Sequence, residues 1–281
     1  MTKHRKSNLW WRAAGIVAVF TSCIMFATFA AAQESTRLTP VQREIERQRQ
    51  RLGSLEVEER RDALMRLANL KRAEASRAAA TALNDASPTV RAAAAHAVIS
   101  LPSNEAATLL LPLLKDKQEF VRREVAFALG ETRHPSAVSA LVDLLKGDKQ
   151  RSVRAAAAIA LGEIGDAAAV PALSQIITGE GSKKQKSRND EEEFVVRSAV
   201  RSLGQIGSRA AVPVLIGALQ NEANSIDTRR ESAVALGRLG DTAALPALNA
   251  AYQANADPYL SEAARDAVRQ INRTKVKGAG D

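Results

Sequence analysis

The feature that most constrains the fold is a motif that recurs along the whole chain. The stretch SVRAAAAIALGEIGDAAAVPALSQII, from Ser152 to Ile177, returns about every 32 residues, with one longer step after its own copy. Its Leu161 has equivalents at Leu67, Val98, Leu129, Leu203, Leu236 and Val268. A large apolar residue follows sixteen positions after each of the first six, at Leu83, Leu114, Leu145, Ile177, Leu219 and Tyr252. A fixed offset inside a fixed period indicates a repeat protein with six units and a terminal half-unit.

Each unit is predicted to contain two helices. In the fourth unit, apolar residues from Val153 to Leu161 recur at three- and four-residue spacing, which is typical of one buried helix face. Gly165 is expected to end this helix in the left-handed conformation, and Asp166 to cap the next segment. Pro171 then falls in the first turn of the second helix, where its missing N–H costs little.

Small residues suit close stacking of such helix pairs. Hydrophobic residues make up 46% of the chain but aromatic residues only 4%, so the core is built mainly from Ala, Leu, Val and Ile. An acidic residue also precedes each Val-Arg pair, as in Asp116 before Arg122 and Asp148 before Arg154. We expect these groups to form a charged ladder along the array. An arginine row for anionic ligands is the alternative.

The units VRREVAFALGETRHPSAVSALVDLLKGD and VRAAAAIALGEIGDAAAVPALSQII resemble HEAT-like repeats of the phycobilisome-lyase type, over about residues 55–273. The resemblance implies an all-α fold: a right-handed α-solenoid of about six HEAT-like helix pairs plus a terminal half-repeat. It also implies that the second helices line the concave face. Members of this family include bilin lyase subunits, a di-iron hydroxylase and many scaffolds without chemistry.

The two ends differ from the repeats. Residues 1–32 have a basic start, an apolar run and the sequence AAA before Gln33, which predicts a signal peptide and a periplasmic or extracellular protein. An uncleaved membrane anchor at residues 13–32 and a lipoprotein at Cys23 are alternatives. Residues 33–53 are polar and contain a predicted capping helix with Thr39 as its N-cap. The repeat domain spans 54–273, and 274–281 is expected to be a disordered tail.

The residues do not point to an enzyme. The di-iron relatives use His-Glu pairs, whereas His96 precedes Ala97 and His134 precedes Pro135. His96 is interpreted as a partly buried helix residue and His134 as a turn residue. Cys23 is the only cysteine, and export would separate the chain from a cytoplasmic bilin acceptor. We therefore predict no catalytic residue, no metal and no cofactor.

Nucleic acid is not expected as a partner either. The net charge is +9, but four of the basic residues lie within the first twelve positions. The second helices carry few bases, so they offer no continuous track for a phosphate backbone. No aromatic residues alternate with the charges to stack on bases.

The remaining hypothesis is protein binding on the face that the second helices form. The candidate residues there are Ser136, Ser139, Asp143, Gln175, Gln220, Asn249 and Gln253. A longer step between units predicts an insertion loop at 178–193, interpreted as a solvated loop or a docking element. Its charged candidates are Lys183, Lys184, Lys186, Arg188, Glu191 and Glu192.

The sequence thus predicts an exported, non-enzymatic scaffold that binds a protein partner through the concave face of a solenoid. Two alternatives stay open. One is an accessory subunit of a lyase-like envelope enzyme. The other is a membrane-anchored structural spacer. This alternative requires that the N-terminal segment is uncleaved, since contact with a membrane is expected only then.

Overall fold

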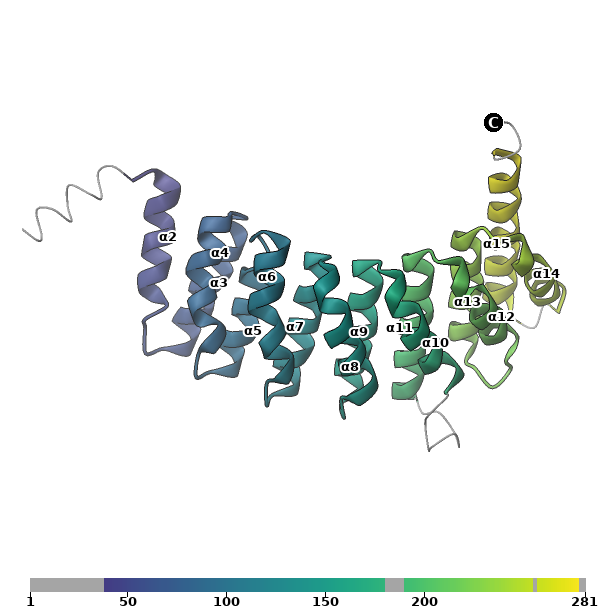
Figure 1. The fold of residues 1–281 in the computed structure, drawn as a ribbon, viewed down its shortest axis with the longest axis horizontal. Coiled ribbons are helices and arrows are strands. Elements are labelled where there is room, and N and C mark those ends of the chain that lie inside the picture. The colour runs from purple at the N-terminus through teal and green to yellow at the C-terminus, as the bar shows by residue number, and fades with distance from the viewer. Residues whose placement is uncertain (1–37, 180–189, 255–256, 278–281) are drawn as a thin grey trace, which may run out of the picture.

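The computed structural model describes residues 38–179, 190–254 and 257–277 (Figure 1). In these ranges all the regular structure is helical, with fourteen α-helices and six short 3-10 segments. The predicted signal segment, Lys183, Lys184, Lys186, Arg188 and residues 278–281 lie outside them. None of the helices in the described part has the length and apolar composition of a membrane-spanning segment.

After an N-terminal helix, α2 (Pro40–Arg51), the helices form a row of antiparallel pairs, with a first and a second helix in each unit (Figure 1). The first helices are α3 (Val57–Asn69), α5 (Pro88–Ala97), α7 (Glu119–Thr132), α9 (Arg151–Ile164), α11 (Asp190–Ile206), α13 (Ile226–Leu239) and the unpaired α15 (Pro258–Lys277). The second helices are α4 (Ala73–Ala80), α6 (Ser103–Leu110), α8 (Val138–Gly147), α10 (Val170–Thr178), α12 (Val212–Gln220) and α14 (Leu245–Ala254). The predicted repeat architecture is therefore confirmed.

The helix ends also follow the predicted pattern. Gly165 ends α9 with a φ of 76°, in the left-handed region that favours glycine. The Asp166 side chain accepts a hydrogen bond from the Ala168 N–H and caps the next turn. Pro171 lies in the first turn of α10. Local sequence signals thus fix the reversal between the two helices of a unit.

The first helices approach one another closely because glycine and small residues meet between them. A Cβ atom on Gly162 would lie 2.7 Å from Cβ of Ser202, and one on Gly237 would lie 2.9 Å from Cα of Ala267. Ordinary side chains at these points would push the helices apart. The helix spacing in this layer is therefore set by the Leu-Gly pairs of the motif.

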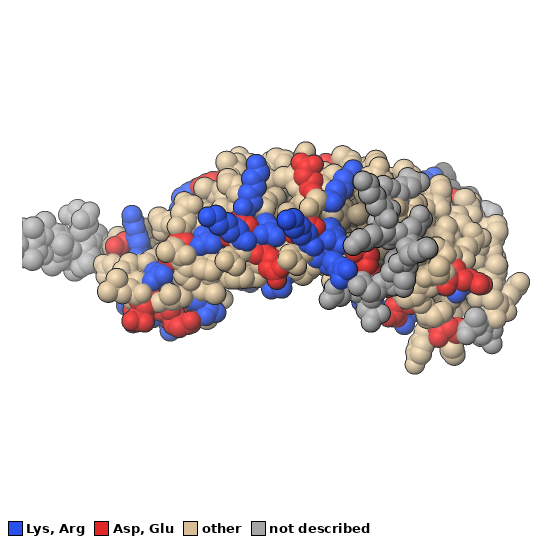
Figure 2. Space-filling model, turned by 90° about the horizontal axis from the view of Figure 1, so that it is seen from below, with Lys and Arg blue, Asp and Glu red and all other residues tan. Residues whose placement is uncertain are grey.

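The first helices, not the second, form the concave side of the array. Helix α9 contacts α7 and α11 much more extensively than α10 contacts α8 and α12. In an arched row the layer with the closer spacing lies on the inside, and the arch is visible in Figure 2. The expectation that second helices line the concave face is wrong, because the glycine contacts draw the first helices together.

The predicted ladder of Arg and Asp is present and links successive units. It contains Arg60–Asp85, Arg91–Asp116 and Arg122–Asp148, with N–O distances of 2.8, 2.7 and 2.7 Å. Arg122 also donates to the carbonyl oxygen of Asp116 in its own turn, at 2.8 Å. Each arginine therefore joins its own turn to the next one. Arg154 pairs with Glu192 instead, at 2.8 Å.

Helix α2 covers the N-terminal end of the array. Thr39 and Gln42 form the expected capping box of α2, and Ile45 and Leu52 pack against the core.

Two of the segment boundaries predicted from the sequence need correction. Residues 190–193 belong to helix α11 rather than to the insertion loop, and residues 274–277 continue α15 rather than starting the tail. Both segments extend helices whose apolar faces are anchored inside the array.

Candidate functional site

The residues predicted to bind a partner are exposed, but they do not form a concave site. Ser139, Asp143, Gln175, Gln220, Asn249 and Gln253 lie on second helices, and Ser136 lies in the short turn before α8. The second helices make few contacts with one another, so these side chains are spread over the convex side. Their assignment to the inner face is wrong for the reason given above.

Only part of the predicted insertion site can be located. Glu192 lies in the first turn of α11 and joins two arginines of the preceding unit, Arg154 at 2.8 Å and Arg151 at 3.4 Å. Glu191 also belongs to this helix, but its side chain lies outside the described part. Glu192 thus takes the place that an aspartate has in the three preceding ladder pairs.

The concave surface is formed by a row of side chains that the sequence reasoning missed. Each lies two positions before Leu161 or the equivalent residue of its unit, which turns it to the opposite side of the first helix. The row consists of Met65, His96, Phe127, Ile159, Arg201, Val234 and Asp266. This row could have been found from the sequence, because the repeat register set by Leu161 and its equivalents also locates it.

Hydrogen-bonded polar pairs and apolar residues alternate along this row. His96 contacts Glu124 of the next unit at 2.9 Å, and Arg201 contacts Glu231 of the next unit at 2.8 Å. Both pairs join equivalent positions of adjacent first helices. Burial raises the pKa of Glu124, but its hydrogen bonds with His96 and Arg123 outweigh burial and leave the pKa below its usual value.

The centre of the row, between the two polar pairs, is apolar. It contains Phe127 on α7 and Ile159 on α9, both only partly buried, and Phe127 packs against the core. Phe194 follows on α11 with 44% of its surface exposed, and Arg197 lies 5.6 Å above its ring. The concave face therefore has an apolar centre with charged groups on either side.

A small hollow lies beside this centre, at the ends of α7 and α9. It has a volume of about 330 Å³ and is lined by Glu131, Arg133 and Glu163. Arg133 has a φ of 52°, in the left-handed region where the later units have glycine. The Glu163 carboxylate packs over Gly130, and its buried Oε2 atom has no hydrogen-bond partner among the described residues.

Glu163 is destabilising as a charged group in this position. Burial raises its pKa, the negative charge of Glu131 raises it further, and Arg133 lowers it only in part. The equivalent residues Gln205 and Gln270 are neutral and cover Gly162 and Gly237 in the same way. A glutamine is therefore the better residue for stability here.

Glu163→Gln is expected to stabilise the protein at pH 7 by a few tenths of a kcal/mol. A raised pKa means that the folded state holds the proton more tightly, so the carboxyl loses stability as the pH rises through its titration. The gain should vanish below about pH 4, where glutamate is protonated in both states. Thermal unfolding of wild type and Glu163→Gln at pH 3 and at pH 7 measures the difference in stability. An equal gain in stability at the two pH values would contradict the prediction.

The two histidines among the described residues, His96 and His134, have different partners and ordinary structural roles. The ring of His134 accepts a hydrogen bond from the Ser136 N–H at 3.3 Å and lies in the turn before α8. His96 belongs to the concave pair with Glu124. Within the described residues, no group of three His, Cys, Asp or Glu side chains is arranged to hold a metal ion.

Comparison with solved structures shows the same fold in other proteins. The complex of CpcE and CpcF of phycocyanin lyase from a Nostoc species matches with a TM-score of 0.50 and 22% identity, over 84% of this chain and 95% of that one. The YibA protein of Escherichia coli matches with a TM-score of 0.53 and 20% identity, over 80% of this chain and 81% of that one. No curated protein sequence matches significantly.

The family is shown by the sequence profile of HEAT repeats. It matches residues 45–128, 109–187 and 184–269, which together include nearly all of the described helices. The matched ranges begin in α2 and end in α15. The chain therefore belongs to the HEAT-repeat family.

Proposed function

We propose that this protein is a non-enzymatic scaffold that binds a segment of another protein along its concave face. The observation that carries the proposal is the apolar centre at Phe127 and Ile159, with a polar side-chain pair on either side. An apolar core with a polar surround is the usual composition of a specific protein interface. Because the stacked helices are closely packed, the face is preorganised, which lowers the entropic cost of binding.

The proposal includes export, on the basis of the N-terminal residues alone. It does not include lyase chemistry. The likeness to the phycocyanin lyase complex is at 22% identity and concerns the fold. Function on a repeat fold depends on the exposed side chains of each protein. A lyase-like accessory role would use the same concave face, so the partner itself would distinguish the two roles.

The double variant Phe127→Glu/Ile159→Glu is expected to weaken partner binding at least tenfold. Two carboxylates in the apolar centre would be desolvated on binding without a compensating charge. The measurement is quantitative recovery of crosslinked partners from the native envelope, followed by titration of the recovered partner. Circular dichroism and a thermal midpoint establish that the variant remains folded.

The matched control is Gln175→Glu/Gln220→Glu, which places the same two charges on exposed positions of the second helices. This control should retain binding within about threefold, because its residues lie on the convex side. Loss of binding in the control, with retention in the concave variant, would show that the partner uses the convex face. Equal retention in both variants would contradict the proposal.

A further inference from the structure

A second charged surface lies on the edge of the array, away from the concave face. It is formed by the turns that lead from a second helix into the next first helix. Lys115 and Lys117 lie at the turn before α7, and Lys146 and Lys149 at the turn before α9. All four are exposed, and no described carboxylate pairs with them. We call these four residues the lysine edge.

Aspartates in the same two turns do not neutralise the lysine edge. Asp116 lies between Lys115 and Lys117, but both its oxygens accept hydrogen bonds from Arg91, at 2.7 and 3.0 Å. Asp148 is held in the same way by Arg122, at 2.7 and 3.0 Å. These arginine and aspartate charges cancel within the ladder. The four lysines outnumber the one other exposed carboxylate at these turns, Glu119 in the first turn of α7, so the net charge toward solvent is positive.

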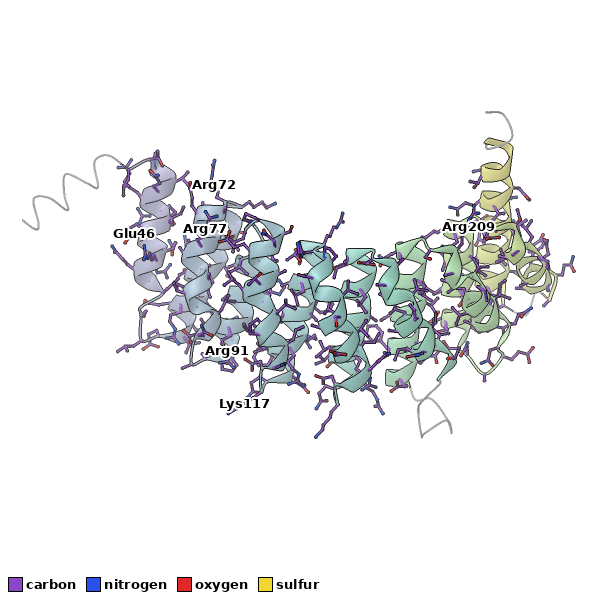
Figure 3. All side chains as sticks on the ribbon, viewed as in Figure 1. Glu46, Arg72, Arg77, Arg91, Lys117 and Arg209 are labelled. Atoms are coloured by element: carbon purple, nitrogen blue, oxygen red, sulfur yellow. The ribbon has the colours of Figure 1, made fainter. Side chains whose placement is uncertain are left out.

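Among the turns of this edge that the structure describes, the positive charge lies in the middle. Figure 2 looks onto the edge and shows Lys and Arg gathered there, and Figure 3 labels Lys117 and Arg91 on it. The preceding turn, residues 84–87, contains no base, and the turn at 221–225 contains Glu222 and no base. Within the described residues, the lysine edge is therefore a short strip across two adjacent turns.

The shape and chemistry of the strip favour one class of ligand. A membrane surface would need positive charge over a wide area and would also meet Glu222. Single-stranded nucleic acid would need aromatic side chains for base stacking, and these turns contain none. Lysine ammonium groups on long flexible stems suit a chain of carboxylates without demanding a fixed geometry.

We propose that the lysine edge is a docking site for an acidic segment of a partner protein. Adjacent first helices are about 8–10 Å apart, so the lysine pairs of the two turns are separated by a similar distance. A segment with a few acidic residues can span this distance and contact both pairs. The site uses none of the residues of the concave face. It therefore does not rest on the proposed function, and either site can fail without the other.

The test is fluorescence anisotropy of a labelled peptide of eight glutamates, titrated with the full chain in a non-ionic detergent at about 50 mM salt. The first variant carries Lys→Gln at all four positions of the lysine edge. The control carries Arg→Gln at Arg43, Arg49, Arg72 and Arg238, which are exposed bases without a described ion-pair partner. Both variants lose the same net charge.

Wild type should bind the peptide with an affinity that falls as salt rises, and the lysine-edge variant should lose at least tenfold. The control should stay within threefold of wild type. Equal loss in both variants would show that only the net charge matters and would overturn the proposal. Failure of wild type to bind the peptide would also overturn it. So would tighter, lysine-dependent binding to vesicles with anionic lipids, or to a single-stranded oligonucleotide.

Discussion

Gly204→Val should destabilise the protein by about 2–4 kcal/mol, because this glycine lies at a close contact between α11 and α13. A Cβ atom on Gly204 would lie 2.8 Å from Cβ of Ala235 and 3.0 Å from its Cα. Both neighbouring atoms belong to a rigid part of α13 and cannot rotate away. The added side chain therefore forces the two helices apart. Denaturant unfolding, followed by circular dichroism, measures the loss.

Gly217→Val is the matched control for this prediction. Gly217 is also within a helix, α12, but no atom lies within 4 Å of the position that a Cβ atom would take there. Valine is a somewhat better helix former than glycine, so this variant should change stability by less than about 0.5 kcal/mol. Similar small effects at both positions would show that close approach of the first helices does not limit stability.

The helix separation should also be visible on the concave face. Arg201 on α11 and Glu231 on α13 are joined at 2.8 Å across the same pair of helices. If Gly204→Val moves the helices apart, this contact lengthens and the concave row loses its regular spacing. The glycine thus connects packing inside the array to the surface proposed to bind a partner.

The repeats, the helix ends and the charged ladder could be predicted because each depends on local or periodic signals. Leu161 and its equivalents fix the register, Gly165 and Asp166 mark a reversal, and Arg122 lies one unit from Asp148. These features can be predicted from the spacing of residues along the chain alone. A helical repeat with small residues at fixed positions can stack in few other ways.

The concave side could not be predicted in the same way, because it depends on which layer of helices packs more closely. That difference arises from contacts between units, such as Gly162 against Ser202, rather than from either helix alone. The spacing of the glycines along the chain indicates packing and capping, but it does not show which layer they draw together. Sequence reasoning therefore places Gln175 and Gln220 on the wrong side and does not single out Phe127 and Ile159.

Asp148→Ala is expected to destabilise the protein by about 3 kcal/mol, because it leaves a mostly buried arginine without its partner. The side chains of Asp148 and Arg122 are only 7% and 15% exposed. Asp148 also accepts a hydrogen bond from the Gln150 N–H at 2.9 Å, which fixes the turn before α9. The control is Asp143→Ala on α8, an exposed carboxylate without a described partner, which should change stability by less than about 0.5 kcal/mol.

The same aspartate should make the fold sensitive to acid. Burial raises the pKa of Asp148, but hydrogen bonds from Arg122 and Gln150 and the charge of Arg154 outweigh it, so the pKa is lowered. A lowered pKa gives stability that is present above the ordinary value of about 3.9 and is lost as the pH falls through the folded value. The difference in unfolding free energy between wild type and Asp148→Ala should therefore shrink from pH 6 to pH 2. A difference that stays constant over this range would mean that packing, not the charge of Asp148, stabilises the ladder.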